Sequence, residues 1–410
     1  MVLLPQALIV FCTHLEFATS MPLQNNPHSS LRFHSKFSRE VREPVTVTAN
    51  ERQLLDLVRR KVAVTRADLA RVTGLAAQSV MRLVDDLAAR GLLVFTDALP
   101  SKARGKPSPQ IALVADFAFC IGASIATDEI NLVLIDFAGN LIGQSTKRMA
   151  PITRLELCSY LRIAIDQLLD LHPMARNRLF GVGVGMTGFF VGHGARLNPP
   201  EPLDDLALID LDLLLEKELG YPVWLDNDGN AAAIGESLLG VGMHCQNFAY
   251  LFFSHGFGGG IVYQGQCMRG AHGNAGEFAG FLPGQGLERP TLEMLRLMCN
   301  EDGQSFATIH DMLEQLDPAW PCVDRWIERC LPALTLVTSA IVGILDTERI
   351  VLGGRLPKAL AERLIARLVI DNIPRRGVQR PQALIVASEI SGDATAIGAA
   401  SLPLKQHFFF

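Results

Sequence analysis

The sequence predicts an α/β protein preceded by a small winged helix-turn-helix unit. Short apolar runs alternate with helical patterns over residues 116–410, which is typical of an α/β body. Residues 49–115 instead carry three closely spaced helical patterns and two short strands. The chain has 410 residues, of which 49% are apolar, so it can bury more than one core. No apolar run reaches the roughly 18 residues of a membrane-spanning helix, so we expect a soluble protein with no membrane partner.

The net charge also differs between the N-terminal unit and the body. Residues 50–106 hold 11 Lys and Arg against 6 Asp and Glu, or +5, and residues 1–49 hold 4 against 3, or +1. Residues 107–410 hold 22 against 33, or −11, so the whole chain has a net charge of −5. This asymmetry suggests that the first unit alone meets nucleic acid. A basic surface that is merely solvated would give the same balance.

The cysteines and the first residues suggest a compartment. None of the eight cysteines forms a C-x-x-C pair, so their spacing predicts neither a zinc ribbon nor a redox dithiol. We therefore expect free thiols in a reducing compartment, the cytoplasm. The apolar opening of residues 1–19 lacks the basic residues of a signal peptide. We expect residues 1–48 to be a disordered tail, or translation to start at Met21.

The first two helical patterns of residues 49–115 are closely spaced. The first covers residues 51–60. The second begins after Thr65, whose hydroxyl can cap the helix while Asp68 reaches back. It is predicted to bury Leu69 and Val72 and to stop at Gly74, because glycine readily takes the left-handed conformation of a tight turn. Together with the third helix they describe a helix-turn-helix.

The third helix, over residues 77–90, is followed by a predicted wing with strands 92–95 and 110–114 around a basic turn. In such a domain the third helix enters the major groove of DNA, and the wing contacts the backbone or the minor groove. The alternative is a helical bundle that binds protein. The predicted DNA-binding residues are Gln78, Ser79, Arg82, Lys102, Arg104 and Lys106.

Glycine clusters in the body mark places where backbone can approach a ligand. The stretch His255–Gly260 follows an apolar run and is predicted to form an anion-binding turn from free N–H groups. Gly353 and Gly354 follow another run, and residues 269–280 form a long loop. The alternative for each cluster is an ordinary turn, which is what glycine-rich stretches at strand ends usually form.

A more specific pattern is the polar turn Asp226-Asn227-Asp228, which ends a strand and begins a helix of small residues. An Asp at such a turn lies beside the positive end of the helix and can accept a proton from a ligand hydroxyl. The alternative is an Asp that caps the helix and binds nothing.

Five stretches of the body follow one another in a characteristic order, namely GVGVGMTG (181–188), GYPVWLDNDGNAAAIGE (220–236), HGFGGGIVYQGQCMRGAHGNAGEFAG (255–280), VLGG (351–354) and ATAIGAA (394–400). They resemble the ROK family of repressors, open reading frames and sugar kinases. The stretch TRADLARVTGLAAQSVMRLVDDLAARGLL (65–93) resembles the winged helices of bacterial regulators. The resemblance implies a two-lobed, actin-like ATPase fold of the sugar-kinase type, with lobes over 116–226 (completed by 390–410) and 227–389. It also implies that the chain belongs to the regulator branch of the family.

The resemblance assigns roles to four residues. Asp228 matches the catalytic base and sugar ligand of the family, and Asn227 a neighbouring sugar contact. Glu277 matches the acid of the family's G-E-x-G-H motif, and Glu293 a second sugar-binding Glu. The winged helix differs from the pattern of bacterial regulators at one position. Ala76 stands where a Ser usually caps the recognition helix.

The first phosphate motif of the family departs further. Residues 122–129 read GASIATDE, with Ser124 in place of an Asp that helps hold Mg²⁺. Ala126 and Thr127 replace two glycines, and Asp128 replaces a Thr. Asp128 puts negative charge where the phosphates of ATP would lie, so we expect no kinase activity and only a vestigial base at Asp228.

The zinc loop of the family has also diverged. Residues 282–290 contain no cysteine, and the last two positions of G-E-x-G-H are Ala279 and Gly280. We therefore expect no metal and no cofactor.

We expect a DNA-binding repressor of carbohydrate-related genes. Its body would sense a sugar or sugar phosphate and form a homodimer or homotetramer on an inverted-repeat operator. The first alternative is a sugar kinase with an accessory DNA-binding domain. The second is a DNA-binding protein whose body serves only for oligomerisation.

Overall fold

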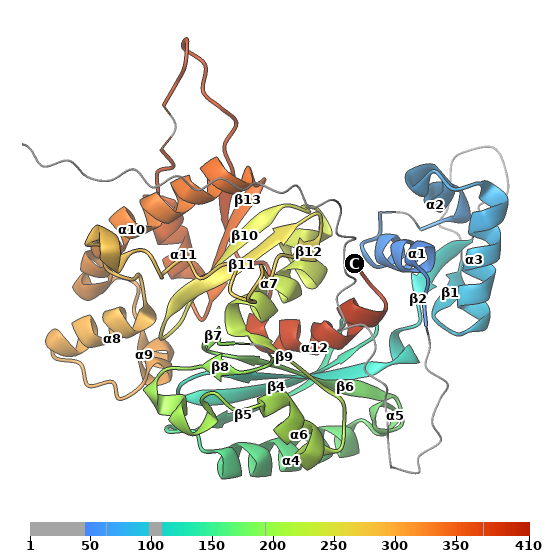
Figure 1. Cartoon of the computed structure of the whole chain (residues 1–410), viewed down its shortest axis with the longest axis horizontal. Coiled ribbons are helices and arrows are strands. Elements are labelled where there is room, and N and C mark those ends of the chain that lie inside the picture. Colours follow the sequence, from blue (N-terminus) through green and yellow to red (C-terminus); the bar gives the residue numbers. More distant parts are fainter. Residues whose placement is uncertain (1–45, 63, 98–108, 193, 372) are drawn as a thin grey trace, which may run out of the picture. The chain divides into compact units, whose positions relative to one another are not determined.

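The computed structural model describes residues 46–62, 64–97, 109–192, 194–371 and 373–410 (Figure 1). The predicted wing residues Lys102, Arg104 and Lys106 lie outside the described residues, and so does most of the predicted tail. The described part consists of a winged helix-turn-helix followed by a two-lobed α/β body of the sugar-kinase type.

The winged helix-turn-helix has the predicted order of elements. β1 pairs with β2 in an antiparallel ribbon. The five elements are α1 (Ala49–Arg59), α2 (Arg66–Thr73), α3 (Ala77–Ala89), β1 (Leu93–Thr96) and β2 (Gln110–Leu113).

Local signals set the ends of these helices. Thr48 and Glu51 form a capping box at the start of α1, and the Thr65 hydroxyl accepts the Asp68 N–H at the start of α2. Gly74 ends α2 with φ +70°. The start of α3 at Ala76 has no side-chain cap.

One prediction about the core of this unit is wrong. Val72 is 41% exposed, whereas its neighbour Leu69 is completely buried. Val72 lies three residues after Leu69, near the end of the short helix α2, where its side chain reaches solvent.

The first lobe is built on a five-stranded sheet. Its order is β5-β4-β3-β6-β9, with β3, β6 and β9 parallel to one another and β4 and β5 antiparallel to their neighbours. The strands are β3 (Phe119–Ile125), β4 (Glu129–Asp136), β5 (Leu141–Arg148), β6 (Leu179–Met186) and β9 (Val223–Asn227). Further elements of this part are α4 (Arg154–Leu171), α5 (Pro173–Arg176), α6 (Leu211–Leu219) and the ribbon β7 (Phe189–Phe190) and β8 (Leu197–Asn198).

The second lobe has a sheet of the same size. Its order is β12-β11-β10-β13-β14, and the parallel pairs are β10–β13 and β13–β14. The strands are β10 (Phe248–Phe253), β11 (Phe257–Tyr263), β12 (Gln266–Cys267), β13 (Arg349–Gly354) and β14 (Leu384–Ala387). The helices of this part are α8 (Leu292–Glu301), α9 (Ile309–Gln315), α10 (Pro321–Leu345) and α11 (Lys358–Ile365).

The predicted turn at His255–Gly260 is wrong for its last four residues, and anion binding by this stretch stays a prediction. Residues from Phe257 onward form β11, and Gly258, Gly259 and Gly260 lie opposite Phe252, Leu251 and Tyr250 of β10. Their backbone groups therefore belong to an antiparallel pair. Gly259 has to be glycine because an added Cβ would lie 1.9 Å from the Tyr250 carbonyl oxygen.

Two helices lie between the two sheets, α7 (Asp228–Leu239) and α12 (Ala394–His407) (Figure 1). α12 packs on β3, β4 and β6 of the first sheet and along α7, while α7 packs on β10 and β11 of the second. Since both lobes share this pair, the predicted limits 49–115, 116–226, 227–389 and 390–410 stay predictions.

Glycines allow α12 to approach its neighbours closely. A Cβ added at Gly183 of β6 would lie 1.7 Å from the Ala399 carbonyl oxygen. One added at Gly122 of β3 would lie 1.9 Å from that of Ala396. Gly398 of α12 faces α7, where an added Cβ would lie 1.7 Å from the Ala231 carbonyl oxygen. Backbone therefore packs on backbone on both sides of α12.

One helix of the described residues, α10, is long and apolar enough to cross a membrane by length and composition alone. One of its faces carries Trp326, Cys330 and Leu334, which are completely buried in the core of the second lobe. Helices that form protein cores commonly have such a composition.

The substitution Gly398→Ala should lower the free energy of unfolding by about 3 kcal/mol, because the new methyl group must push α12 away from α7. Urea denaturation measures this change. The control is Gly343→Ala on α10, where an added Cβ has no atom within 4 Å. The control should raise stability by about 0.5–1 kcal/mol, as expected for alanine in place of glycine in a helix. Equal losses from both substitutions would contradict the close packing of α12.

Candidate functional site

A cavity of about 390 Å³ lies between the two lobes. The cavity lies at the carboxyl ends of β3, β6, β9, β10 and β13. Open α/β sheets usually bind ligands at this edge. The polar residues that line it include Ser124, Glu129, Asn131, Thr187, Asp228, Ser254, His310, Arg355, Asp393 and Thr395.

Asp228 is the first residue of α7 and lies in this cavity. Its carboxylate accepts hydrogen bonds from the Thr187 hydroxyl (2.7 Å) and from the Gly229 N–H (2.8 Å). The residue that caps α7 is Asn227, whose side-chain oxygen accepts the N–H groups of Gly229 and Asn230. Asn227 rather than Asp228 is therefore the cap of α7, and a ligand contact of Asp228 stays a prediction.

The predicted sugar contact of Asn227 competes with structural bonds. Besides capping α7, its amide nitrogen donates to the Gly188 carbonyl oxygen at 2.5 Å. Both ends of the side chain are thus occupied within the protein, and the role of Asn227 toward a ligand stays a prediction.

Two carboxyl groups in this region have raised pKa values. Burial raises the pKa of Asp228 to about 6, against the opposing hydrogen bonds from Thr187 and Gly229. Glu277 keeps an exposed surface. Partial burial of its carboxyl, followed by the charge of Asp228, raises its pKa to about 7, while Arg289 acts in the opposite direction. Asp228 therefore lies close enough to Glu277 for its charge to raise the pKa of Glu277.

Several contacts fix the loop that carries Glu277 to the body, among them those of Arg269 and Asn274. Arg269 pairs with the completely buried Asp226 at 2.7 Å. Asn274 makes two hydrogen bonds to the backbone of Phe190, of 2.8 and 2.9 Å. Sequence reasoning did not assign a role to Asp226 or Arg269, although Asp226 stands in the polar turn that it singled out.

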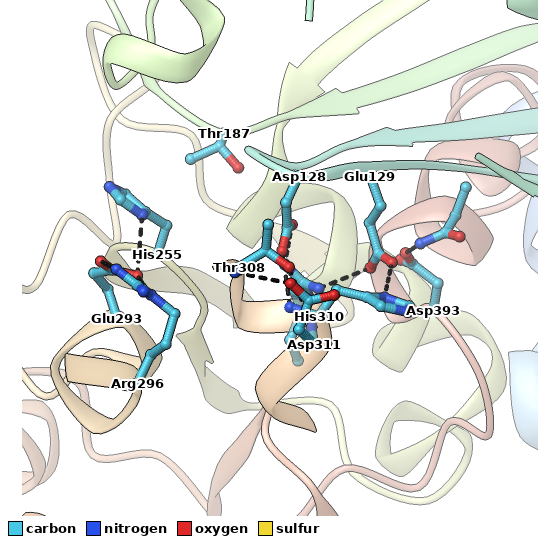
Figure 2. Close-up of polar contacts among 12 residues, drawn as sticks. Asp128, Glu129, Thr187, His255, Glu293, Arg296, Thr308, His310, Asp311 and Asp393 are labelled. Atoms are coloured by element: carbon cyan, nitrogen blue, oxygen red, sulfur yellow. Dashed lines mark hydrogen bonds and ion pairs between the residues drawn. The ribbon is translucent and has the colours of Figure 1, made fainter. Parts of the chain in front are cut away.

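Glu293 lies on α8, away from the cluster around Asp128 (Figure 2). Its carboxylate binds the Arg296 guanidinium (2.5 and 2.8 Å) and lies 4.0 Å from Nδ1 of His255. A sugar contact of Glu293 stays a prediction, and it would have to share the carboxylate with Arg296.

The divergent phosphate motif lies at the cavity as well. Ser124, Ala126 and Glu129 line it. Asp128 binds Arg355, which directly follows Gly354 at the end of β13, and the backbone N–H of His310. Sequence reasoning missed Arg355 and His310, because nothing in their local pattern indicates a contact with a turn about 200 residues away in the chain.

The predicted DNA-binding residues within the described part are exposed. Gln78, Ser79 and Arg82 all lie on the solvent side of α3, while Val80 and Val84 face the core. An exposed polar face over a buried apolar face is what a recognition helix requires.

Helix α1 is in contact with the end of α12. The Arg52 guanidinium donates to the carbonyl oxygens of Gln406 (3.0 Å) and His407 (3.3 Å), and it lies over the ring of Phe410. Arg59 donates to the Leu238 carbonyl oxygen at the end of α7 and lies over the ring of Phe409. The start of the winged unit is thus tied to the two helices that lie between the lobes.

Among the described residues, no group of three or more His, Cys, Asp or Glu side chains could hold a metal ion. The candidate site consists of hydrogen-bonding groups and charges.

The fold and the cleft define a sugar-kinase-type body behind a winged helix. Residues 120–285 match the ROK family and residues 45–103 match the MarR family. The chain thus contains a ROK family domain preceded by a MarR-type winged-helix domain.

Individual relatives agree with this assignment. The uncharacterized protein y4fQ of Sinorhizobium fredii is 29% identical over 88% of this chain and 92% of its own length. The xylose repressor of Bacillus subtilis is 24% identical over 56% of this chain and 59% of its own length. A solved structure of a ROK family transcriptional regulator, a homologue of the Escherichia coli Mlc protein, shares the fold with a TM-score of 0.61 at 19% identity, covering 88% of this chain and 96% of that one.

The substitution Asp228→Asn should stabilise the fold at neutral pH. The pKa of Asp228 is higher in the fold than its ordinary value of 3.8. Its protonated form therefore favours the fold, and this contribution is lost as the pH rises through about 6. The amide avoids this loss and can still bond to Thr187 and Gly229. At pH 7.5 the Tm should rise by a few degrees, which corresponds to a gain on the order of 2 kcal/mol.

Thermal denaturation between pH 4 and pH 8 measures this effect. The control is Asp205→Asn, whose carboxylate forms an exposed pair with Arg154 and should change the Tm little. A lower Tm for Asp228→Asn at pH 7.5 would show that the ionised carboxylate stabilises the fold.

Proposed function

We propose that this protein is a cytoplasmic, DNA-binding repressor of sugar-related genes that acts as a symmetric oligomer on an inverted-repeat operator. The observation that carries the proposal is the exposed face of α3, with Gln78, Ser79 and Arg82, in a winged helix joined to a sugar-kinase-type body. Polar side chains of a recognition helix can reach base edges and phosphates in the major groove. The xylose repressor among the relatives supports the link to sugar genes.

The body acts as the sensor in this proposal. Asp228 lines the cleft between the lobes, and Glu277 lies near enough for the charge of Asp228 to raise its pKa. Both carboxyl groups can accept hydrogen bonds. Such groups suit the hydroxyls of a sugar. The interface between lobes also gives the ligand a means to favour one arrangement of the lobes over another.

Helix α12 supplies the connection between the cleft and the winged helix. At its start, Asp393 and Thr395 line the cavity, and the Thr395 hydroxyl donates to the Asp228 carbonyl oxygen at 3.3 Å. At its end, Gln406 and His407 bind Arg52 of α1. A ligand that shifts α12 by a small amount would therefore shift α1, about 20 Å away along a helix of 14 residues.

The second candidate is a sugar kinase, which is favoured by the retained Asp228 beside the cavity. Two features of the phosphate region oppose it. Ser124 stands where an Asp would help hold Mg²⁺, and Asp128 binds Arg355 of the other lobe at 2.5 Å, where a nucleotide phosphate would need cationic partners.

The substitution Arg82→Ala should weaken binding to an operator by tenfold or more, because the guanidinium contacts a base edge or a phosphate. Sequencing of the genomic fragments that the full chain retains identifies the operator, and fluorescence anisotropy at fixed salt measures the affinity. Arg104→Ala should weaken binding as well. The control is Arg196→Ala on the body, whose side chain pairs with Asp210. Unchanged affinity for both Arg82→Ala and Arg104→Ala would rule out the winged helix as the DNA-binding unit.

A panel of sugars and sugar phosphates should contain a ligand that raises the Tm. The shift should disappear in Asp228→Ala and in Glu277→Ala, and the same ligand should weaken operator binding. Mixed with ATP and Mg²⁺, this sugar should remain unphosphorylated. Phosphoryl transfer that Asp228→Asn abolishes would establish the kinase instead, and a panel without any ligand would favour a body that serves only for oligomerisation.

A further inference from the structure

Two acidic side chains at the turn between β3 and β4 reach across the cleft to the second lobe. Asp128 and Glu129 are adjacent and buried, with 6% and 8% of their surfaces exposed. Both bind the guanidinium of Arg355, at 2.5 Å from Asp128 and 3.1 Å from Glu129. Arg355 is itself only 12% exposed. One cation of the second lobe is thus shared by two carboxylates of the first.

His310 of the second lobe binds the same two carboxylates. Its backbone N–H donates to Asp128 at 2.9 Å, and its Nδ1 lies 2.6 Å from Glu129 (Figure 2). A capping box between Thr308 and Asp311 fixes the first turn of α9, in which His310 lies. The position of His310 is therefore fixed by α9 as well as by its contacts with the two acids.

Arg355 and His310 face the cavity that holds Asp228. Glu129, His310 and Arg355 line this cavity together with Asp228 and Asp393. Arg355 follows two glycines at the carboxyl end of β13, and Asp128 follows the carboxyl end of β3. Strand ends that meet across a cleft, with an Arg and an N–H group between them, are what binding of a phosphate requires.

We infer that Arg355 and His310 form a latent phosphate site, which the carboxylates of Asp128 and Glu129 occupy in place of a ligand. The cleft therefore selects unphosphorylated, polyhydroxylated ligands and rejects their phosphates. This inference rests on the proposed function in one respect, namely that the cleft holds the effector.

The charges around the cluster explain the selection. Acidic groups face it from four elements, namely Asp128 and Glu129 from the β3–β4 turn, Glu314 from α9, Asp228 from α7 and Asp393 from the start of α12. The basic groups are Arg355, His310 and Arg148, and Arg148 is bound to Glu314. A phosphate would have to displace two carboxylates from Arg355 and would add negative charge to an acidic cavity. A sugar hydroxyl meets neither obstacle, because it can donate to Asp228.

The internal carboxylates also bridge the lobes without a nucleotide. In a kinase the phosphates and their metal ion contact both lobes. Here the bonds from Asp128 and Glu129 to Arg355 and His310 span the cleft. The lobes can thus hold a fixed arrangement in the absence of ATP.

The test combines Asp128→Asn and Glu129→Gln in the full chain, so that neither carboxylate any longer competes with a phosphate for Arg355 and His310. These changes keep the shapes of the side chains and remove both charges. Inorganic tripolyphosphate is the probe, and calorimetry and thermal shift measure its binding. The wild type should not bind it at millimolar concentration, and the double variant should bind at least tenfold more tightly. Adding Arg355→Met to the double variant should abolish the gain.

The control is Asp205→Asn, which frees Arg154 of the first lobe outside the cleft and should gain no binding. Glu129→Gln alone leaves the pair of Asp128 and Arg355 in place and should show a smaller gain in tripolyphosphate affinity. This single variant replaces the double variant in the test if the double variant does not fold. Binding by the wild type, a folded variant without any gain, or a gain that survives Arg355→Met would each overturn the inference. None of these measurements involves DNA, so failure here is distinct from failure of the proposed repressor function.

Discussion

The close contact of α12 with its neighbours is the constraint on which the body depends. Gly122 and Gly183 let the helix lie on the first sheet, and Gly398 lets it lie on α7. The two lobes therefore share a central pair of helices with backbone packed on backbone. Because interiors are close-packed, such a pair moves as a unit and has little room to deform. A displacement at the start of α12 is thus transmitted to its other end.

The polar groups of the cleft lie around this rigid centre. Thr187 and the start of α7 hold the carboxylate of Asp228 in position. Asp128 and Glu129, at the turn between β3 and β4, bind Arg355 and His310 of the other lobe. In the proposed function, these side chains occupy the part of the cleft where a kinase would hold ATP, and the body senses a ligand without changing it chemically.

Much of the fold can be predicted from local pattern. Capping residues, Gly74 and the spacing of apolar residues define the winged helix, and ordered motifs indicate the body. Errors arise where the outcome depends on distant partners. Gly258–Gly260 form a strand only because β10 lies beside them, and Val72 is exposed because α2 is short. In the candidate site, Asp228 stands out at a strand end. Arg355 and His310 do not, because their role exists only where two lobes bring them to Asp128.

The charged contacts at the two ends of the molecule differ in their exposure to solvent. Arg355, Asp128 and Glu129 are buried between the lobes, whereas Gln78, Ser79 and Arg82 face solvent. Mobile ions screen buried pairs little, but they compete directly with the contacts between a protein and DNA phosphates. A change in ionic strength therefore acts on the proposed operator contact and leaves the ion pairs of the cleft largely intact. Osmotic conditions in the cell would thus alter operator occupancy without changing how the body recognises its ligand.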